Sequence, residues 1–216
     1  MTDETLAHLR RADPVLGKLI RRVGACQLVP KKDRTPFQSL VRAVAHQQLN
    51  GTAAETILGR FIALFPGKRF PGPEDLATVS DDQLRGVGFS RAKVAAIRDI
   101  TLRTGQGLVP DSRCIARMHD DEIVNQLVQC RGVGRWTVEM LLIFKLGRPD
   151  VLPADDFGVR NGFRLTYGGD AMPKPKELLE FGERWRPYRT TATWYLWRAV
   201  DLSRQVTKLS KLANQP

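Results

Sequence analysis

Apolar side chains recur at helical spacing along almost the whole chain, and this pattern constrains the fold more than any other feature. They fall on one face of a helix in the segments 37–44, 57–65, 123–128 and 178–185. No segment keeps the strict alternation of a half-buried strand. The sequence therefore predicts an all-α protein of about ten short helices with essentially no sheet.

Proline, serine and glycine mark the expected helix ends. Thr35-Pro36 opens a helix and Pro66-Gly67 closes one, whereas Pro73 and Ser80 open short helices and Gly105-Gln106-Gly107 ends another. No Gly/Ser-rich linker and no block of like charge divides the chain. We therefore expect residues 1–216 to form one compact unit.

Two helical lobes are expected within that unit, because the segments near residues 110 and 150 suit crossings of the chain. One lobe would hold residues 35–110 together with a hairpin at about 120–146, and the other the N-terminus together with residues 150–216. A cleft between two lobes is the natural place for a site.

The charge balance points to a polyanionic partner. The 216 residues include 34 Lys and Arg against 23 Asp and Glu, a formal net charge of +11. The hydrophobic share of 42% is that of an ordinary globular protein, and a chain of this length buries a sizeable core without a metal or disulfide staple.

The cysteines and the N-terminus exclude several classes of protein. Cys26, Cys114 and Cys130 are odd in number and widely spaced, so they form neither a disulfide framework nor a CxxC zinc or iron–sulfur site. The first 24 residues carry charges every few positions, unlike a signal peptide, and no run approaches about 18 apolar residues. We expect a soluble, intracellular protein.

One short motif occurs twice, each time between helix-like segments. Residues 84–88 read LRGVG and residues 130–134 read CRGVG. A Gly-x-Gly turn leaves backbone N–H groups uncovered at the start of the next helix, where the dipole favours a phosphate. A simple corner between two helices, with glycine just after the first one, explains the motif as well. The net positive charge favours the phosphate interpretation.

The second motif belongs to a longer pattern. It continues to residue 138 and is followed by LPADDFGVR at 152–160, with HQQLNG at 46–51 before it and RWRPYR at 184–189 after it. Together these segments resemble the helix–hairpin–helix DNA glycosylase superfamily, and in particular the DNA-3-methyladenine glycosylase II family, over about residues 35–200. The chain departs from the family at Arg131, where proline is common, and it is too short for the N-terminal β domain of the larger members.

The resemblance implies an activity and its partners. It implies a monofunctional glycosylase of base excision repair that flips alkylated purines such as 3-methyladenine and 7-methylguanine out of double-stranded DNA and hydrolyses their glycosidic bond. We expect a monomer without cofactor, acting in the nucleoid of a bacterium or the nucleus of a eukaryote.

Two adjacent carboxylates carry the candidate chemistry. Asp155 and Asp156 follow Pro153 and precede a helical stretch, so that one carboxylate can cap the helix while the next points into the cleft. Asp156 matches the family's essential aspartate, which stabilises an oxocarbenium-like sugar and orients water. The alternative is that both are ordinary helix-capping acids.

Aromatic side chains are the candidates for the pocket that reads the flipped base. The resemblance places Trp136 and Trp197 at pocket positions, while Phe157 adjoins Asp156 and suits the pocket or the core equally. The remaining aromatic candidates are expected in the core or the pocket wall: Trp185, Trp194 and Tyr188.

The segment near residue 48 would fill the gap that the flipped base leaves. Gln48 resembles the superfamily's wedge position, with Leu49 and residues 51–53 as competitors. Gly51 and Thr52 are also expected at the DNA. His46 has no acidic partner evident in the sequence and is expected to be solvated or to cap a helix.

The hairpin is expected to hold the DNA backbone through Gly132, Gly134 and Arg135. The resemblance also suggests a structural Na⁺ or K⁺ that bridges to a DNA phosphate from backbone carbonyls of the hairpin, here those of Val128, Cys130 and Val133.

Position 136 decides the reaction type. Bifunctional members carry a lysine there that forms a Schiff base with the abasic sugar, whereas this chain has Trp136, and Lys145 is expected off that helix face. We expect hydrolysis without lyase activity and no iron–sulfur cluster, since the cysteine cluster of some relatives is absent.

The rival interpretations are a glycosylase for oxidised or mispaired bases and a non-catalytic DNA-binding module, which would not need Asp156.

Overall fold

The structure, a computed structural model, describes residues 3–49 and 51–213, with side chains up to residue 206. All regular elements in these ranges are helical, which confirms the predicted all-α fold. In chain order the α-helices are α1 (Asp3–Ala12), α2 (Pro14–Val23), α3 (Pro36–His46), α4 (Gly51–Ala63), α5 (Asp81–Gly86), α6 (Arg91–Gly105), α7 (Ser112–Arg117), α8 (Asp120–Leu127), α9 (Arg135–Leu141), α10 (Phe157–Tyr167), α11 (Pro175–Gly182) and α12 (Arg189–Ala213).

Three short turns of other helix types complete the described part of the chain. Two are 3₁₀ turns, Asp75–Thr78 and Glu183–Trp185, and the third is a π turn, Leu142–Leu146, that continues α9. The expectation of about ten short helices was too low and missed the length of α12. That helix runs for 25 residues because neither proline nor glycine interrupts it.

Local capping explains several helix starts. Thr35 and Ser80 each accept a hydrogen bond from a backbone N–H three residues ahead, and the glutamine there returns a bond to the cap. These capping boxes satisfy N–H groups that lack partners within the helix. The helix predicted to end at Gly105 does end there.

The chain divides into two compact units. The split unit combines Met1–Val29 with Gly147–Pro216, and the continuous unit is Pro30–Leu146. Within the continuous unit α3 packs against α4, α6 and α9, with Leu40, Val41 and Val44 buried on the inner face of α3. Helix α6 contributes Ile97 and Ile100 to the same core.

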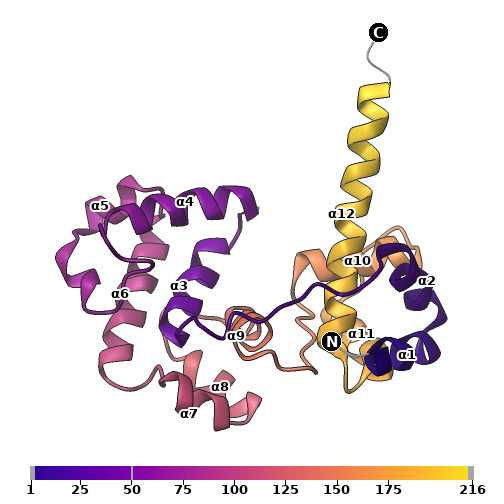
Figure 1. The fold of residues 1–216 in the computed structure, drawn as a ribbon, viewed down its shortest axis with the longest axis horizontal. Coiled ribbons are helices and arrows are strands. Elements are labelled where there is room, and N and C mark those ends of the chain that lie inside the picture. Colours follow the sequence, from indigo (N-terminus) through magenta and orange to yellow (C-terminus); the bar gives the residue numbers. More distant parts are fainter. Residues whose placement is uncertain (1–2, 50, 214–216) are drawn as a thin grey trace. The chain divides into compact units, whose positions relative to one another are not determined.

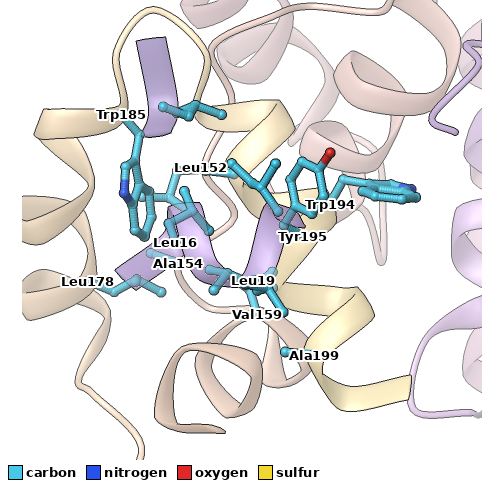
Figure 2. Close-up of a cluster of buried hydrophobic side chains, with 14 residues drawn as sticks. Leu16, Leu19, Leu152, Ala154, Val159, Leu178, Trp185, Trp194, Tyr195 and Ala199 are labelled. Carbon is cyan, nitrogen blue, oxygen red and sulfur yellow. The ribbon is translucent and has the colours of Figure 1, made fainter. Parts of the chain in front are cut away.

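In the split unit both ends of the chain share one core. Helices α1 and α2 pack together, and α2 contacts α10 and α12 (Figure 1). Figure 2 shows the buried cluster, in which Leu16 and Leu19 of α2 meet Trp185 and Tyr195 from the other end of the chain. Trp185 and Trp194 are buried and Tyr188 packs against the cluster, as expected.

A buried carboxylate joins the two ends of the chain within this core through hydrogen bonds. Asp13, only 3% exposed, caps α2 by accepting bonds from two backbone N–H groups, and it also accepts bonds from the Tyr167 hydroxyl at 2.6 Å and the Trp185 indole at 2.9 Å. Burial, together with Asp13, raises the pKa of Tyr167, so its hydroxyl stays a donor. Four donors compensate for burying the charge.

Among the described helices none is long and apolar enough to cross a membrane.

Candidate active site

Asp156 sits at the N-terminus of α10 in the split unit. Its Oδ1 accepts bonds from the Val159 backbone N–H at 2.7 Å and from the Trp197 indole N–H at 2.9 Å. One of the two carboxylates caps the helix, as expected, but it is Asp156, the residue expected to face the cleft, and Asp155 is exposed. Capping and catalysis are compatible, since the bonds and the helix dipole hold a negative charge in a fixed orientation.

Trp197 approaches Asp156 from α12. Its ring is partly buried against the hydrophobic cluster of the split unit while its N–H faces the carboxylate. Gly158 lies beneath the pair: a Cβ there would be 3.0 Å from Asp156 Oδ1 and 3.0 Å from Trp197 Cδ1. The bond between Trp197 and Asp156 could not be predicted from local sequence, because it spans 41 positions of the chain.

The structure brings Asp156 and Trp197 together and leaves the other pocket candidates untested. Phe157 is the first residue of α10 and is 65% exposed, so it is not a core side chain. Trp136 is partly buried in the first turn of α9, in the continuous unit. The base-pocket roles of these three aromatic residues therefore stay predictions.

The hairpin α8–turn–α9 lies wholly in the continuous unit. Gly132 adopts φ +73°, and a Cβ there would lie 2.7 Å from the Ala96 side chain, so both conformation and space require glycine. The backbone N–H of Arg131 donates to Asp99 Oδ2 at 2.7 Å. A proline at position 131 could not make this bond, which gives the departure from the family pattern a physical meaning.

The two GVG turns differ at the start of the helix that follows. After the first turn, Ser90 caps α6 by accepting a bond from the Lys93 backbone N–H at 3.3 Å. After the second, the cap of α9 is Gly134, which has no side chain to fill that place. The first turn is a helix corner whose Gly88 packs against Ile57. The second suits a phosphate oxygen.

Arg135 follows Gly134 and is 61% exposed. Its Nε pairs at 3.1 Å with Oε1 of Glu139, a nearly buried carboxylate one turn along α9. A fixed, exposed guanidinium beside the turn is a suitable contact for a DNA backbone.

The segment between α3 and α4 carries the wedge candidates. Gln48 has φ +56°, uncommon for a residue with a side chain, and both Gln48 and Leu49 are exposed. Gly51 and Thr52 are exposed at the start of α4, and Asn50 lies outside the described residues. Which side chain acts as the wedge stays a prediction.

Two side chains that the sequence did not single out hold this segment. The Gln47 amide donates to the carbonyl of Gly132 at 2.9 Å and to Thr137 Oγ1 at 3.0 Å. The Lys93 ammonium donates to the carbonyls of Ala45 and Gln47. Burial lowers the pKa of Lys93.

The expectation that His46 has no acidic partner is wrong. Its Nε2 lies 3.1 Å from Oε1 of Glu55 on α4, which also pairs with Arg42 at 3.4 Å. Glu55 lies nine residues further along the chain, on the next helix, so local sequence does not reveal this pairing.

Lys145 lies in the π turn that continues α9, 5% exposed, and its Nζ donates to the Lys32 carbonyl at 3.0 Å. Burial lowers its pKa. Burial also raises the pKa of the Cys130 thiol to about 11, so it stays neutral. In the described part of the chain no three His, Cys, Asp or Glu side chains group as metal ligands.

The α8–turn–α9 unit, with its uncapped second helix, defines a protein of the helix–hairpin–helix class. Residues 41–187 match the HhH-GPD superfamily of base excision DNA repair proteins, and the chain belongs to this family. The family predicted from the motifs is thereby confirmed.

Several known relatives share most of their length with this chain. It is 38% identical to DNA-3-methyladenine glycosylase 1 of Schizosaccharomyces pombe over 91% of this chain and 86% of the relative. A solved S. pombe 3-methyladenine DNA glycosylase in complex with abasic DNA superposes with a TM-score of 0.86 at 37% identity, covering 90% of this chain and 95% of that one. A DNA-3-methyladenine glycosidase of Bacillus halodurans gives 0.76 at 35% identity, covering 90% and 88%.

Proposed function

We propose that this protein is a monofunctional DNA glycosylase of base excision repair that removes alkylated purines such as 3-methyladenine and 7-methylguanine. The names of its relatives support this substrate class over most of the chain. One observation carries the proposal: a carboxylate, Asp156, is fixed at a helix N-terminus by a backbone N–H and an indole N–H.

The chemistry follows from the charge of Asp156. Breaking the glycosidic bond leaves positive charge on the sugar, and an oriented carboxylate stabilises that charge and can orient the attacking water. An alkylated purine that already carries a positive charge is a good leaving group and needs no acid to protonate it. A single carboxylate is then sufficient for hydrolysis.

Hydrolysis without lyase activity fits the lysines near the hairpin. Trp136 has no amine to form a Schiff base. Lys145, the nearest lysine after it, is buried and donates to a backbone carbonyl. Borohydride should therefore trap no covalent complex between this protein and abasic DNA.

The partner is double-stranded DNA carrying alkylated bases, bound by a monomer in the nucleoid of a bacterium or the nucleus of a eukaryote. Gly132, Gly134 and Arg135 would hold the phosphate backbone without reading its sequence, consistent with the net charge of +11.

A monovalent cation at the hairpin is part of this proposal. Carbonyl oxygens are suitable ligands for such an ion, and Val128, Cys130 and Val133 would supply them. The Cys130 carbonyl accepts one bond, from the Val133 N–H at 3.1 Å, and a carbonyl has a second lone pair. Held there, the ion would supply positive charge beside the turn that we propose for the DNA phosphate.

Two neighbouring carboxylates provide the test. Asp156→Asn and Asp155→Asn each remove one negative charge at nearly the same place. We expect Asp156→Asn to lower single-turnover release of 7-methylguanine by several orders of magnitude while binding lesion DNA at least as tightly, and Asp155→Asn to be much milder. A wild-type protein that released none of a panel of damaged bases, while still binding DNA, would favour the non-catalytic module instead.

A further inference from the structure

Gln48 and Leu49, the wedge segment, follow α3 and are exposed, so they need support to keep their orientation. Gln48 occupies the left-handed region at φ +56°, which side chains rarely adopt, and Leu49 beside it is 40% exposed. Neither residue can be fixed by its own burial. What fixes the segment must lie at its base.

Gln47 joins that base directly to the hairpin. A carbonyl oxygen only accepts hydrogen bonds, so the amide presents its nitrogen to Gly132, and the same nitrogen donates to Thr137 Oγ1. Gly132 lies in the hairpin turn, and Thr137, 1% exposed, lies in the first turn of α9. One side chain thus links the segment to both sides of the helix start that we propose for the DNA phosphate.

Helix α6 supports the segment and the hairpin from one rigid element. At its start, Lys93 donates to the carbonyls of Ala45 and Gln47 at 2.9 and 2.8 Å. Further along, Ala96 contacts Gly132, and Asp99 accepts the N–H of Arg131. A displacement of the hairpin turn therefore reaches the wedge segment through the Gln47 amide.

We propose that Gln47 is a positioning residue that couples base flipping to binding of the DNA backbone. When the hairpin holds a phosphate, the Gln47 amide keeps Gln48 and Leu49 in the orientation in which one of them can enter the base stack. Without this bond the segment would have to be ordered at each insertion, which opposes flipping. The inference rests on the proposed function and adds a role that the wedge itself does not have.

A matched pair of variants separates this role from general packing. Gln47→Met keeps the length of the side chain and removes its donor. Gln126→Met makes the same change at a glutamine of the same unit, whose amide donates instead to the Leu108 carbonyl at 2.7 Å. Melting curves show whether both variants fold as the wild type does.

The assay compares one lesion in two contexts. Single-turnover release of 7-methylguanine is measured from a fully paired duplex and from a mismatched bubble in which the base is already unstacked. We expect Gln47→Met to slow release about 10-fold in the paired duplex and by less than about twofold in the bubble. Gln126→Met should equal the wild type in both. Equal losses of Gln47→Met in both contexts, or no loss in the paired duplex, would overturn the proposal.

A second measurement does not require turnover. In a duplex with 2-aminopurine opposite an abasic-site analogue, insertion of a wedge should unstack the 2-aminopurine and raise its fluorescence. At saturating protein, Gln47→Met should give a smaller rise than wild type and Gln126→Met the same rise. Equal rises for all three proteins would reject the coupling even if the wild type released no base, and that lack of release would contradict only the proposed function.

Discussion

Adding one methyl group at Gly158 should disturb the candidate catalytic carboxylate without unfolding the protein. In Gly158→Ala the new Cβ would lie 3.0 Å from Asp156 Oδ1 and 3.0 to 3.2 Å from the indole of Trp197. These separations are shorter than ordinary contacts, so the carboxylate and the indole must move apart by a few tenths of an ångström.

The size of the effect follows from the bond that this movement weakens. A hydrogen bond to a charged acceptor contributes about 1.5–3 kcal/mol. In the reaction that we propose, the Trp197–Asp156 bond, at 2.9 Å, orients the carboxylate. Losing most of it should therefore lower the rate of base release by about 10- to 100-fold. Gly158 has no positive φ, so alanine adds no backbone strain and stability should stay within about 1 kcal/mol of wild type.

Two other helix glycines serve as controls. Gly59→Ala, on α4, meets nothing within 4 Å and should gain up to about 1 kcal/mol of stability with unchanged activity. Gly162→Ala, on α10, would place its Cβ 2.0 Å from the Leu196 carbonyl oxygen and should cost about 3 kcal/mol or more. The assays are single-turnover release of 7-methylguanine and denaturant unfolding. A Gly158→Ala protein as active as Gly59→Ala would refute the role assigned to the Asp156–Trp197 pair.

Four further outcomes are expected. Asp13→Asn should cost about 3 kcal/mol of unfolding free energy, because an amide group would face the hydroxyl and indole donors; a loss below about 1 kcal/mol in urea would contradict this. Binding to undamaged duplex should weaken steeply with salt, and Arg135→Ala should reduce the slope of log affinity against log salt concentration by about 1. An unchanged slope would mean that Arg135 contacts no phosphate. Gln48→Ala should slow base excision and leave the affinity for undamaged duplex unchanged. Equal losses of excision rate and of affinity would indicate that Gln48 contacts the DNA backbone. Wild type should release 3-methyladenine faster than neutral hypoxanthine, and Trp197→Ala should erode that preference, since an indole face attracts a cationic ring by about 0.5–2 kcal/mol; the reverse order in matched single-turnover assays would reject this pocket.

What the sequence predicted well depends on neighbouring residues. The helix starts predicted at Thr35 and Ser80 are stabilised by partners three residues away, and the helical class follows from apolar spacing. Asp156 was identified by resemblance to a family, and its place at a helix N-terminus follows from the residues around it.

What the sequence could not supply depends on contacts made by the folded chain. The Gln47 amide meets a carbonyl 85 residues away, and Trp197 meets a carboxylate 41 residues away. His46 pairs with Glu55, which lies on the next helix. The π turn at Leu142–Leu146, which sets the position of Lys145, reads LIFKL, an apolar run that equally suits a continued α-helix.

The split unit also sets the order in which the protein can be completed on the ribosome. Pro30–Leu146 emerges as one uninterrupted stretch, whereas α1 and α2 emerge first and need partners from the other end of the chain. The side-chain hydrogen-bond donors to Asp13, Tyr167 and Trp185, are synthesised 154 and 172 residues later. At ordinary rates of translation this takes roughly 8 to 35 seconds. Asp156 likewise acquires its indole partner only when the last helix is made, so a nascent chain exposes the hairpin proposed to bind DNA before the proposed catalytic carboxylate is in position.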